Sequence, residues 1–368
     1  MKNQIGFITI GQAGHNIGSV FEAAGFDVLH INTAETDLAT LENSKYKHHI
    51  KNGEGCNKNR DKAKQLLKDD LDSTLAKIEQ TLSQEYIFPI FSLGGGTGSG
   101  MGPMLTALLI EQLGKKTGAI TVMPSEQEGI RTLANALECF TELELIDTEY
   151  NMCASFVLDN NRASADKFTL NNAFYKLFTS FLDIPAHHNA NAKGNIDPAE
   201  VKEMIGTSGM AIISKLPKAK DNIPGIIESF RENIFAPPER DGRIKYLGIS
   251  SPLLADMSIE TLTESLVKET GQYFEVYSGV NTDNTICMFC GLSFPYTKLK
   301  ALKDRAESSR DIIAKKMQKE TRISKSKDLV LDLDLDSSNS STSSSSAKNT
   351  QVEKANLSDI LSKFMKKK

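Results

Sequence analysis

The sequence predicts an α/β fold in which a largely parallel sheet carries helices on both faces. Apolar, strand-like runs alternate with segments of helical periodicity along most of the 368 residues, a pattern typical of repeated β-α-β units. Two of the strands end in glycine-rich turns, at 11–18 and 94–100. Hydrophobic residues make up 39% of the chain, which is enough for a sizeable buried core at this length.

The elements follow from the apolar runs and from the residues that interrupt them. Residues 61–83 are polar apart from apolar side chains at helical spacing, from Leu66 to Ile78, so we expect a helix there. In the first half we expect strands at 4–10, 26–32, 86–93 and 118–123, separated by helices at 15–24, 61–83 and 102–113. In the second half we expect helices at 223–233 and 257–271 and strands at 243–249 and 285–292.

These elements divide the chain into six segments. We expect two α/β domains at 1–165 and 184–295, a central helix at 166–183, a long charged helix at 296–325, an acidic, Ser-rich linker at 326–350 and a basic amphipathic tail at 351–368. Eight of the ten residues at 337–346 are serines and cannot bury apolar surface. We therefore expect the linker to be disordered.

The composition argues against several classes of protein. The net charge of −4 is unlike that of a protein whose whole surface binds nucleic acid. No run approaches the roughly 18–20 apolar residues that span a bilayer, and the strand expected from Gln4 leaves no room for a secretory signal. The five cysteines do not form a disulfide framework. We therefore expect a soluble, cytoplasmic protein.

The two glycine-rich turns are candidate phosphate sites. At the carboxyl end of a strand, glycine lets backbone N–H groups point at phosphate oxygens, and the next helix adds its positive N-terminus. The turn at 94–100 holds five glycines in seven residues, an entropic cost that argues against a purely structural connection. The turn at 11–18 could equally be a tight link between strand and helix.

Two common nucleotide motifs do not fit these turns. A P-loop ends in Gly-Lys-Ser/Thr, but Gly100 is followed by Met101. A dinucleotide fold has G-x-G-x-x-G and an acid after the second strand, whereas this chain has G-x-A-G and Asn32-Thr33. A non-polymerising dinucleotide-binding protein remains the alternative from another class.

The segment GGGTGSG at 94–100 resembles the signature of the tubulin/FtsZ superfamily of GTPases. GQAGHNIG at 11–18 is similar to the tubulin form of the first loop, and PSEQEGIR at 124–131 resembles the bacterial P-F-x-x-E-G-x-x-R motif. NIDPAEV at 195–201 resembles the synergy loop. The resemblance covers roughly 3–320 and implies a tubulin/FtsZ-like fold, with a Rossmann-like GTP-binding domain, a central helix and a smaller activation domain.

The same resemblance implies a site for GTP and GDP with Mg²⁺. Gln12 would lie near the α- and β-phosphates and the Mg²⁺, directly or through water. The turn at 53–57 would close over the γ-phosphate, unless it is an ordinary surface loop. Glu128 would contact the ribose, with Arg131 one turn beyond; the alternative is a solvated ion pair between the two. The nucleotide-binding residues implied are Gly11, Gln12, Ala13, Gly14, Asn16, Gly53, Gly55, Gly94, Gly95, Gly96, Thr97, Gly98, Ser99, Gly100, Glu128, Arg131, Phe168 and Asn172.

Two residues of the central helix are implied to read the base. Phe168 would pack on the purine, although a helical aromatic is more often core. Asn172 would read the guanine edge, because a carboxamide both accepts and donates hydrogen bonds. Asn171 is the alternative reader, and Asn161 is a weaker candidate for contact with the base.

The expected catalytic residues are Glu200 and Asp197. The resemblance places their loop at the opposite end of the subunit from the phosphates, so they would act on the nucleotide of the next subunit in a head-to-tail filament. There a carboxylate can orient or deprotonate the attacking water. The structural alternative is that Asp197 caps a helix that begins at Pro198.

Two other motifs have structural interpretations. Cys287 and Cys290 have CxxC spacing but lie in an apolar strand without a second ligand pair, so we expect two buried cysteines and not a zinc site. His187 and His188 lie in a polar insert and are expected to be solvated.

The tail at 351–368 carries a net charge of +3 and an apolar helical face of Leu357, Ile360, Leu361 and Phe364. It could dock on a DNA-binding adaptor, lie on an anionic membrane, or be a solvated end. Resemblance to the plasmid and phage partition GTPases of the superfamily favours the adaptor. We expect self-association into filaments, indirect contact with centromeric plasmid or phage DNA in a bacterial host, and no stable membrane association. A cell-division filament GTPase is the alternative within the superfamily.

Overall fold

The computed structural model describes residues 1–319, apart from 163–166, 188–193, 241 and 282. Two units are distinguished, 1–304 and 305–368. In the second unit the described part is the continuation of helix α11 (Tyr296–Lys319). The predicted linker at 326–350 and the basic tail at 351–368 lie outside the described residues. Along the described part of the chain, no helix is both long and apolar enough to cross a membrane.

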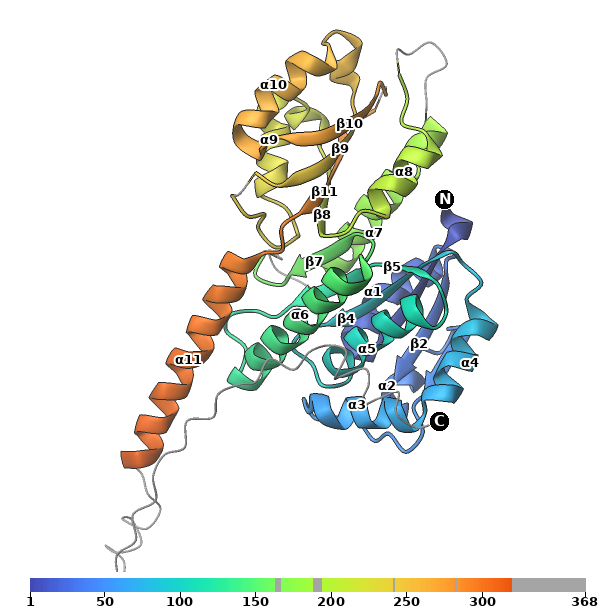
Figure 1. The fold of residues 1–368 in the computed structure, drawn as a ribbon, viewed down its shortest axis with the longest axis vertical. Coiled ribbons are helices and arrows are strands. Elements are labelled where there is room, and N and C mark those ends of the chain that lie inside the picture. The colour runs from blue at the N-terminus through green and yellow to red at the C-terminus, as the bar shows by residue number, and fades with distance from the viewer. Residues whose placement is uncertain (163–166, 188–193, 241, 282, 320–368) are drawn as a thin grey trace, which may run out of the picture. The chain divides into compact units, whose positions relative to one another are not determined.

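The first unit is built on one mixed sheet (Figure 1). Its order is β10-β9-β11-β8-β7-β6-β4-β1-β2-β3, with β5 beside β4. The strands of the first half are β1 (Ile5–Ile10), β2 (Asp27–Asn32), β3 (Tyr46–His49), β4 (Tyr86–Ser92), β5 (Lys116–Thr117), β6 (Ala119–Met123) and β7 (Ser155–Asp159). Those of the second half are β8 (Met210–Lys215), β9 (Ile244–Ser250), β10 (Tyr273–Gly279) and β11 (Ile286–Leu292).

Helices connect these strands. They are α1 (Gly11–Ala23), α2 (Glu35–Ala39), α3 (Arg60–Asp69), α4 (Leu71–Thr81), α5 (Thr97–Glu111), α6 (Ile130–Tyr150), α7 (Lys167–Leu182), α8 (Pro198–Ile205), α9 (Ile223–Arg231) and α10 (Ile259–Thr270). The parallel sheet predicted for the first half is confirmed, because β1 pairs in parallel with β2 and β4, and β6 pairs in parallel with β4 and β7.

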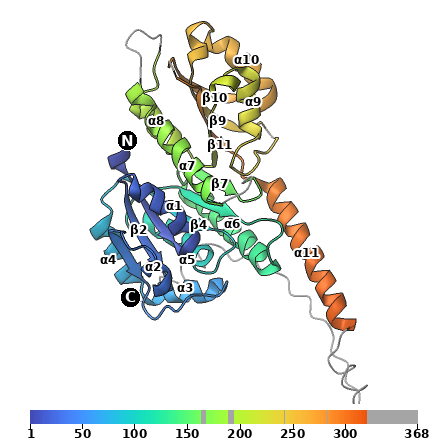
Figure 2. The same cartoon turned by 180° about the vertical axis from the view of Figure 1, so that it is seen from behind.

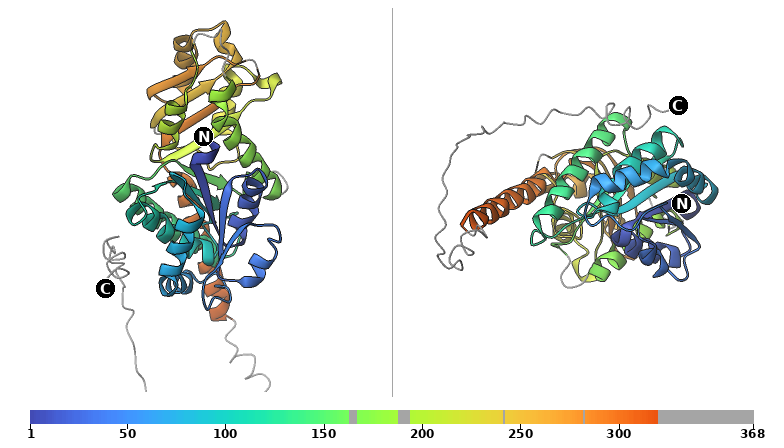
Figure 3. Two further views of the ribbon diagram at one scale, coloured as in Figure 1. Left: turned by 90° about the vertical axis from the view of Figure 1, so that its right-hand side faces the viewer. Right: turned by 90° about the horizontal axis from the view of Figure 1, so that it is seen from below.

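Both faces of this parallel sheet are covered, as Figures 2 and 3 show. Side chains alternate along β4, so Phe88 and Phe91 point to opposite faces. The ring of Phe88 lies 6.1 Å from that of Phe178 on α7. The ring of Phe91 packs so closely on α5 that a Cβ at Gly102 would lie 2.6 Å from it. Strands buried on two faces explain the uninterrupted apolar runs of the sequence.

Three predicted elements differ from the structure. The helix expected at 61–83 is two helices, because the backbone leaves helical geometry at Asp70, with φ −116° and ψ 20°. The glycine-rich segment at 11–18 is not a turn: α1 begins at Gly11, directly after β1. The chain passes from β1 into α1 at Gly11, whose φ of 72° is one that other residues rarely adopt. The helix after the second glycine-rich segment also begins early, at Thr97.

The sheet continues into the second half of the unit through one pair, Ser155 with Met210. There β11 runs antiparallel to both β8 and β9, while β9 and β10 are parallel. The boundary expected near 184 therefore does not interrupt the sheet. The division of the chain into two domains stays a prediction.

Candidate active site

Two helix N-termini meet at the carboxyl edge of the parallel sheet. A Cβ on Gly11 would lie 3.4 Å from the amide nitrogen of Gly98, so the first turns of α1 and α5 are in contact. Neither helix has a side-chain cap or an acid in its first turn. The first N–H groups of any helix have no intrahelical partner, and here no capping side chain satisfies them either. The positive dipole ends of both helices lie at the same place. This arrangement favours an anion, and it contains the predicted residues 11–14 and 94–100.

Close packing explains most glycines of the second segment. A Cβ would lie 2.8 Å from the backbone nitrogen of Lys58 at Gly96, 2.9 Å from the carbonyl oxygen of Ile10 at Gly98, and 2.6 Å from that of Arg60 at Gly100. Gly95 differs, because a Cβ there would meet nothing within 4 Å. The backbone at Gly95 therefore faces open space next to the two helix N-termini.

We call the starts of α1 and α5, together with the segment at 94–100, the cradle. The predicted γ-phosphate turn at 53–57 packs against the cradle through Thr33. The N–H of Gly55 donates to the carbonyl oxygen of Thr33 at 2.9 Å, and a Cβ at Gly53 would lie 2.5 Å from the same oxygen. The hydroxyl of Thr33 lies 2.8 Å from that of Thr97, the first residue of α5. The turn and the cradle are thus joined by the residue that follows β2.

Lys58 brings a cation to the cradle. Its Nζ donates to Thr132 Oγ1 at 2.7 Å, and the methyl group of Thr132 would lie 2.4 Å from a Cβ on Gly94. The backbone at Asn57 and Lys58 is left-handed, with φ of 43° and 57°, an uncommon conformation for non-glycine residues that often marks functional sites. Asn135 holds the arrangement by donating to the carbonyl oxygens of Lys58 and Gly95, at 3.0 and 2.9 Å.

Thr33, Lys58, Thr132 and Asn135 are absent from the sequence-based site. Lys58 and Thr132 are 74 residues apart, so spacing alone does not connect them. One signal was present: the glycine segment lacks the lysine of a P-loop, and Lys58 directly follows the turn at 53–57.

A buried guanidinium supports the cradle from behind. Arg60, 5% exposed, donates from Nε and Nη2 to the carbonyl oxygen of Ser99 at 3.3 and 3.1 Å. Its ion pairs to Glu138 and Glu142 measure 2.8 and 2.7 Å. Burial disfavours the charge, but these carboxylates outweigh burial and raise the pKa of Arg60. The arginine therefore ties α5 to α6.

Glu128 and Arg131 do not form the ion pair that was the alternative to a nucleotide role, at least among the described residues. Glu128 Oε1 accepts from the N–H of Ser125 at 3.3 Å. Arg131 Nη1 donates to the carbonyl oxygen of Asn57 at 3.4 Å, on the turn beside the cradle. Arg131 thus contacts the residue that precedes Lys58. Contact of Glu128 with a ribose stays a prediction.

The base-reading residues are only partly described. The side chain of Phe168 lies outside the described residues. On α7, Asn171 is buried and Asn172 is exposed. The carboxamide of Asn161 accepts from the N–H of Glu126 at 3.0 Å and donates to Asp159 Oδ1 at 2.6 Å, so it links two loops. The assignment of Asn172 as the guanine reader stays a prediction.

Asp197 and Glu200 form a capping box at the start of α8. Asp197 Oδ1 accepts from the N–H groups of Ala199 and Glu200 at 2.7 and 2.9 Å. Glu200 Oε2 accepts from the N–H of Asp197 at 2.8 Å. The capping role that was the structural alternative is therefore confirmed. Partial burial raises the pKa of Glu200, despite the backbone hydrogen bond that it accepts.

Helix α8 lies at the edge of the sheet opposite the cradle. Its last residue, Ile205, accepts a hydrogen bond of 2.8 Å from the N–H of Ala154, which directly precedes β7. The cradle follows the carboxyl ends of β1 and β4. A strand of six residues at ~3.3 Å each separates these two edges by roughly 20 Å.

The cysteine motif does not join the site. Cys287 and Cys290 are both buried in β11, as predicted, and burial raises their pKa values. In the described ranges, no three His, Cys, Asp or Glu side chains are grouped as metal ligands would be. The side chains of His187 and His188 lie outside the described residues.

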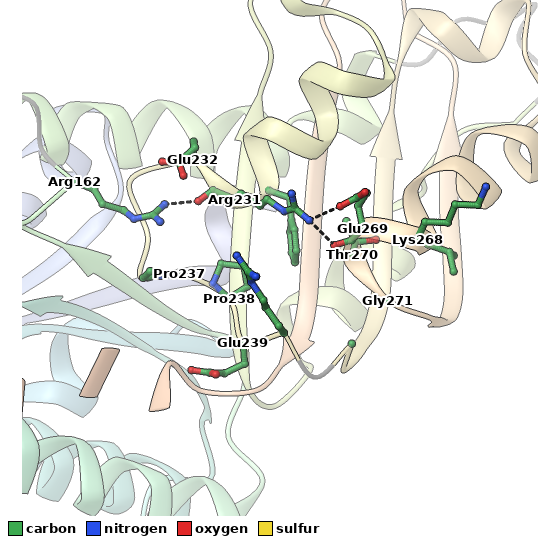
Figure 4. A pocket seen from close by; sticks show the side chains of 14 residues that line it. Arg162, Arg231, Glu232, Pro237, Pro238, Glu239, Lys268, Glu269, Thr270 and Gly271 are labelled. Atoms are coloured by element: carbon green, nitrogen blue, oxygen red, sulfur yellow. Dashed lines mark hydrogen bonds and ion pairs between the residues drawn. The ribbon is translucent and has the colours of Figure 1, made fainter. Parts of the chain in front are cut away.

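A separate hollow of about 590 Å³ lies between the ends of α9 and α10 (Figure 4). Arg162 donates to the carbonyl oxygen of Arg231, and Arg231 pairs with Glu269. Pro237 and Pro238 line the hollow between these elements. Arg162 and Arg231 are thus both engaged within the protein, and the residues that line the hollow include none of the cradle.

Comparison with known proteins agrees with this geometry. Residues 4–164 match the model of the Tubulin/FtsZ family, GTPase domain. The tubulin-like protein TubZ of Clostridium botulinum C phage is 27% identical over 337 residues, 90% of this chain and 89% of the relative. The structure of Clostridium botulinum phage c-st TubZ with a truncated C-terminal tail has a TM-score of 0.74 at 25% identity, and covers 84% of this chain and 99% of that chain.

A second solved structure shows the same fold. It is a GTPγS-form protofilament of Bacillus thuringiensis serovar israelensis TubZ, with a TM-score of 0.72 at 18% identity, covering 85% of this chain and 94% of that chain. The matched family range contains both helix N-termini, the turn at 53–57 and Lys58. Residues 4–164 thus match the GTPase domain of the Tubulin/FtsZ family, in a chain with the tubulin/FtsZ-like fold that is similar to TubZ over most of its length.

Proposed function

We propose that this GTPase assembles head to tail into filaments and that assembly completes its active site. The observation that carries the proposal is the separation of the parts: the cradle and the capping box of Asp197 and Glu200 lie at opposite edges of the sheet. A second copy can bring them together, and the head-to-tail contact it makes generates an open filament. The protofilament form of a TubZ with this fold supports the same arrangement.

In the proposed site the cradle binds the β- and γ-phosphates. The N–H groups at the starts of α1 and α5 donate to phosphate oxygens, and Lys58 supplies the cation that a P-loop lysine would provide. Gln12 donates its amide N–H to Asn16 at 3.1 Å, which leaves its carbonyl oxygen for a hard cation or for water bound to it. These oxygen and N–H groups fit GTP with Mg²⁺, which would neutralise developing phosphate charge.

Hydrolysis then needs only a positioned water. The Glu200 carboxylate of the adjoining copy would orient that water toward the γ-phosphorus and accept its proton as the bond to the leaving GDP breaks. Asp197 would keep Glu200 in place through the capping box. Turnover is therefore expected to rise with filament mass.

GTP-dependent pelleting, measured together with phosphate release over a range of protein concentrations, tests this proposal. Phosphate release per subunit should increase steeply above the concentration at which pellets appear. A protein that binds GTP and hydrolyses it at the same rate per subunit at all concentrations would contradict assembly-completed catalysis. Binding without any pelleting would favour the non-polymerising alternative.

The biological role that we propose is segregation of plasmid or phage DNA through a TubR-like DNA-binding adaptor. The similarity to phage TubZ supports it, together with the basic, amphipathic sequence at 351–368. Removal of 351–368 should leave GTP-dependent pelleting unchanged and abolish co-sedimentation of the adaptor with filaments. Unchanged co-sedimentation would dismiss the tail as the docking segment. Loss of the plasmid or phage on deletion of the gene would separate this role from cell division.

A further inference from the structure

A chain of buried polar side chains runs directly beneath the cradle. Thr9, His15 and His30 are fully buried, and Asn32 is 1% exposed. They come from β1, α1 and β2. The series of hydrogen bonds that joins them starts at Glu22, in the last turn of α1. Such groups are costly to bury unless every donor meets an acceptor. The distances allow the direction of each hydrogen bond to be assigned.

The assignment begins at the carboxylate. His30 Nε2 lies 3.1 Å from Glu22 Oε2, so the neutral ring carries its proton on Nε2 and donates it to Glu22. His30 Nδ1 is then an acceptor, and it takes the hydroxyl proton of Thr9 at 2.7 Å. The Thr9 oxygen, having used its only proton, must accept from His15 Nδ1–H at 2.8 Å.

The proton position on His15 fixes the next bond. With its proton on Nδ1, His15 accepts at Nε2, where Asn32 Nδ2 donates at 3.1 Å. The approach of the two Nδ1 atoms to 3.3 Å agrees with one of them carrying a proton and the other a lone pair. Burial lowers the pKa of both rings, that of His15 to about 3, which keeps both neutral.

Asn32 connects this series of hydrogen bonds to the cradle through Thr33. Its second N–H donates to Asp37 Oδ2 at 3.0 Å, and its Oδ1 accepts from the N–H groups of Thr33 and Ala34 at 2.8 and 3.2 Å. All the hydrogen-bonding groups of the Asn32 side chain are thus engaged. The residue that it holds, Thr33, contacts both Thr97 and the turn at 53–57.

We propose that His15 is a positioning residue for the nucleotide: its Nδ1–H tautomer orients Asn32, and Asn32 sets Thr33 against the phosphate cradle. The inference rests on the proposed nucleotide site and adds a residue that touches neither phosphate nor water. It predicts that the acceptor at the Nε2 position of His15, and not the ring as such, controls affinity for the nucleotide.

Two substitutions separate these features. His15→Gln can place a carbonyl oxygen where Nε2 accepts from Asn32, whereas His15→Asn is too short to reach Asn32 and can only replace the donor to Thr9. We expect mant-GTP affinity within about threefold of wild type for H15Q and a loss of about tenfold for H15N, with KM changed and kcat of assembled protein nearly unchanged. His48→Gln is the control, because His48 is hydrogen-bonded to Asp70 at 3.0 Å and belongs to no part of the buried polar series beneath the cradle.

The outcomes are distinguishable from failure of the proposed function. If wild-type protein binds no mant-GTP, the nucleotide site itself is wrong. If wild type binds and H15N matches it, or if H15N and H15Q lose affinity equally at equal folded fractions, the positioning role is overturned. Nitrogen NMR of the histidine rings gives an independent reading, since a proton on Nε2 of His15 in the folded protein would also contradict the assignment.

Discussion

The Glu200 carboxylate accepts a hydrogen bond of 2.8 Å from the backbone N–H of Asp197, while Asp197 Oδ1 accepts one of 2.9 Å from the N–H of Glu200. The residue expected to act on the attacking water is therefore also half of a helix cap. Any substitution of Glu200 changes the start of α8 as well as the proposed chemistry. A useful variant must keep the first role while removing the second.

Glu200→Gln meets that requirement, because its amide oxygen can still accept from Asp197 but cannot take a proton from water. We expect E200Q to pellet with GTP as wild type does and to release phosphate about 100-fold more slowly. Its thermal unfolding should match that of wild type, whereas Glu200→Ala should unfold at a lower temperature, because it loses the half of the capping box that satisfies the N–H of Asp197. Wild-type turnover in E200Q filaments would remove Glu200 from the mechanism.

Gly95 and Gly96 are neighbours with opposite surroundings, and they separate binding from folding. A methyl at Gly96 would lie 2.8 Å from the Lys58 backbone, while a methyl at Gly95 would meet nothing within 4 Å. Gly95→Ala should therefore fold with wild-type stability yet bind mant-GTP weakly, because the methyl occupies space that the phosphates need. Gly96→Ala should lower the unfolding temperature. G95A with wild-type nucleotide affinity would show that the phosphates lie elsewhere.

Lys58 should distinguish GTP from GDP. Lys58→Gln retains a donor for Thr132 but removes the charge beside Gly94. If the ammonium faces the γ-phosphate, GTP affinity should fall about tenfold while GDP affinity changes little, since hydrogen bonds to charged groups contribute about 1.5–3 kcal/mol. Lys51→Ala is the charge-matched control on the same loop. Equal losses for both nucleotides would place Lys58 away from the γ-phosphate.

How far the sequence predicts the strands depends partly on burial. The inner strands β1, β4 and β6 are largely apolar and are predicted within a few residues, as is β2, although Asp27, His30 and Asn32 interrupt its apolar side chains. The inner strands β7 and β8 are missed, although both are mostly buried. The edge strands β3 and β10 are also missed, because their side chains are half-exposed and mostly polar or aromatic, as Phe274 at 78% exposure illustrates. Their pairing is decided by the neighbouring strand and leaves little periodicity in the sequence.

The site shows the same division. The glycine-rich segments stand out by composition, so 11–14 and 94–100 are singled out from the sequence alone, and their binding of phosphate stays a prediction. Thr33, Lys58 and Asn135 are ordinary residue types whose role comes from contacts across the fold, such as Asn135 with Gly95. The start of α1 at Gly11 was missed because a glycine-rich sequence has low helix propensity, and tertiary packing overrides that preference.

The buried histidines predict a pH dependence of stability whose sign can be worked out. Burial lowers the pKa of His15 to about 3 and also lowers that of His48, although Asp70 opposes the shift at His48. In the unfolded chain both titrate near the ordinary value of about 6.5. Between these pH limits the unfolded state binds more protons, so stability is lost as the pH falls below about 6.5.

The test is the difference between wild type and His15→Gln in urea unfolding at pH 7 and pH 5. Asp147 acts in the opposite sense, since burial raises its pKa, and comparison of two proteins that both contain it removes that contribution. Well below pH 6.5, wild type should lose up to about 1.4 kcal/mol per pH unit more than H15Q. His48→Gln should show a smaller difference, because Asp70 offsets part of the burial. Parallel stability curves for wild type and H15Q would mean that His15 is protonated in the folded protein, and the tautomer assigned beneath the cradle would then be wrong.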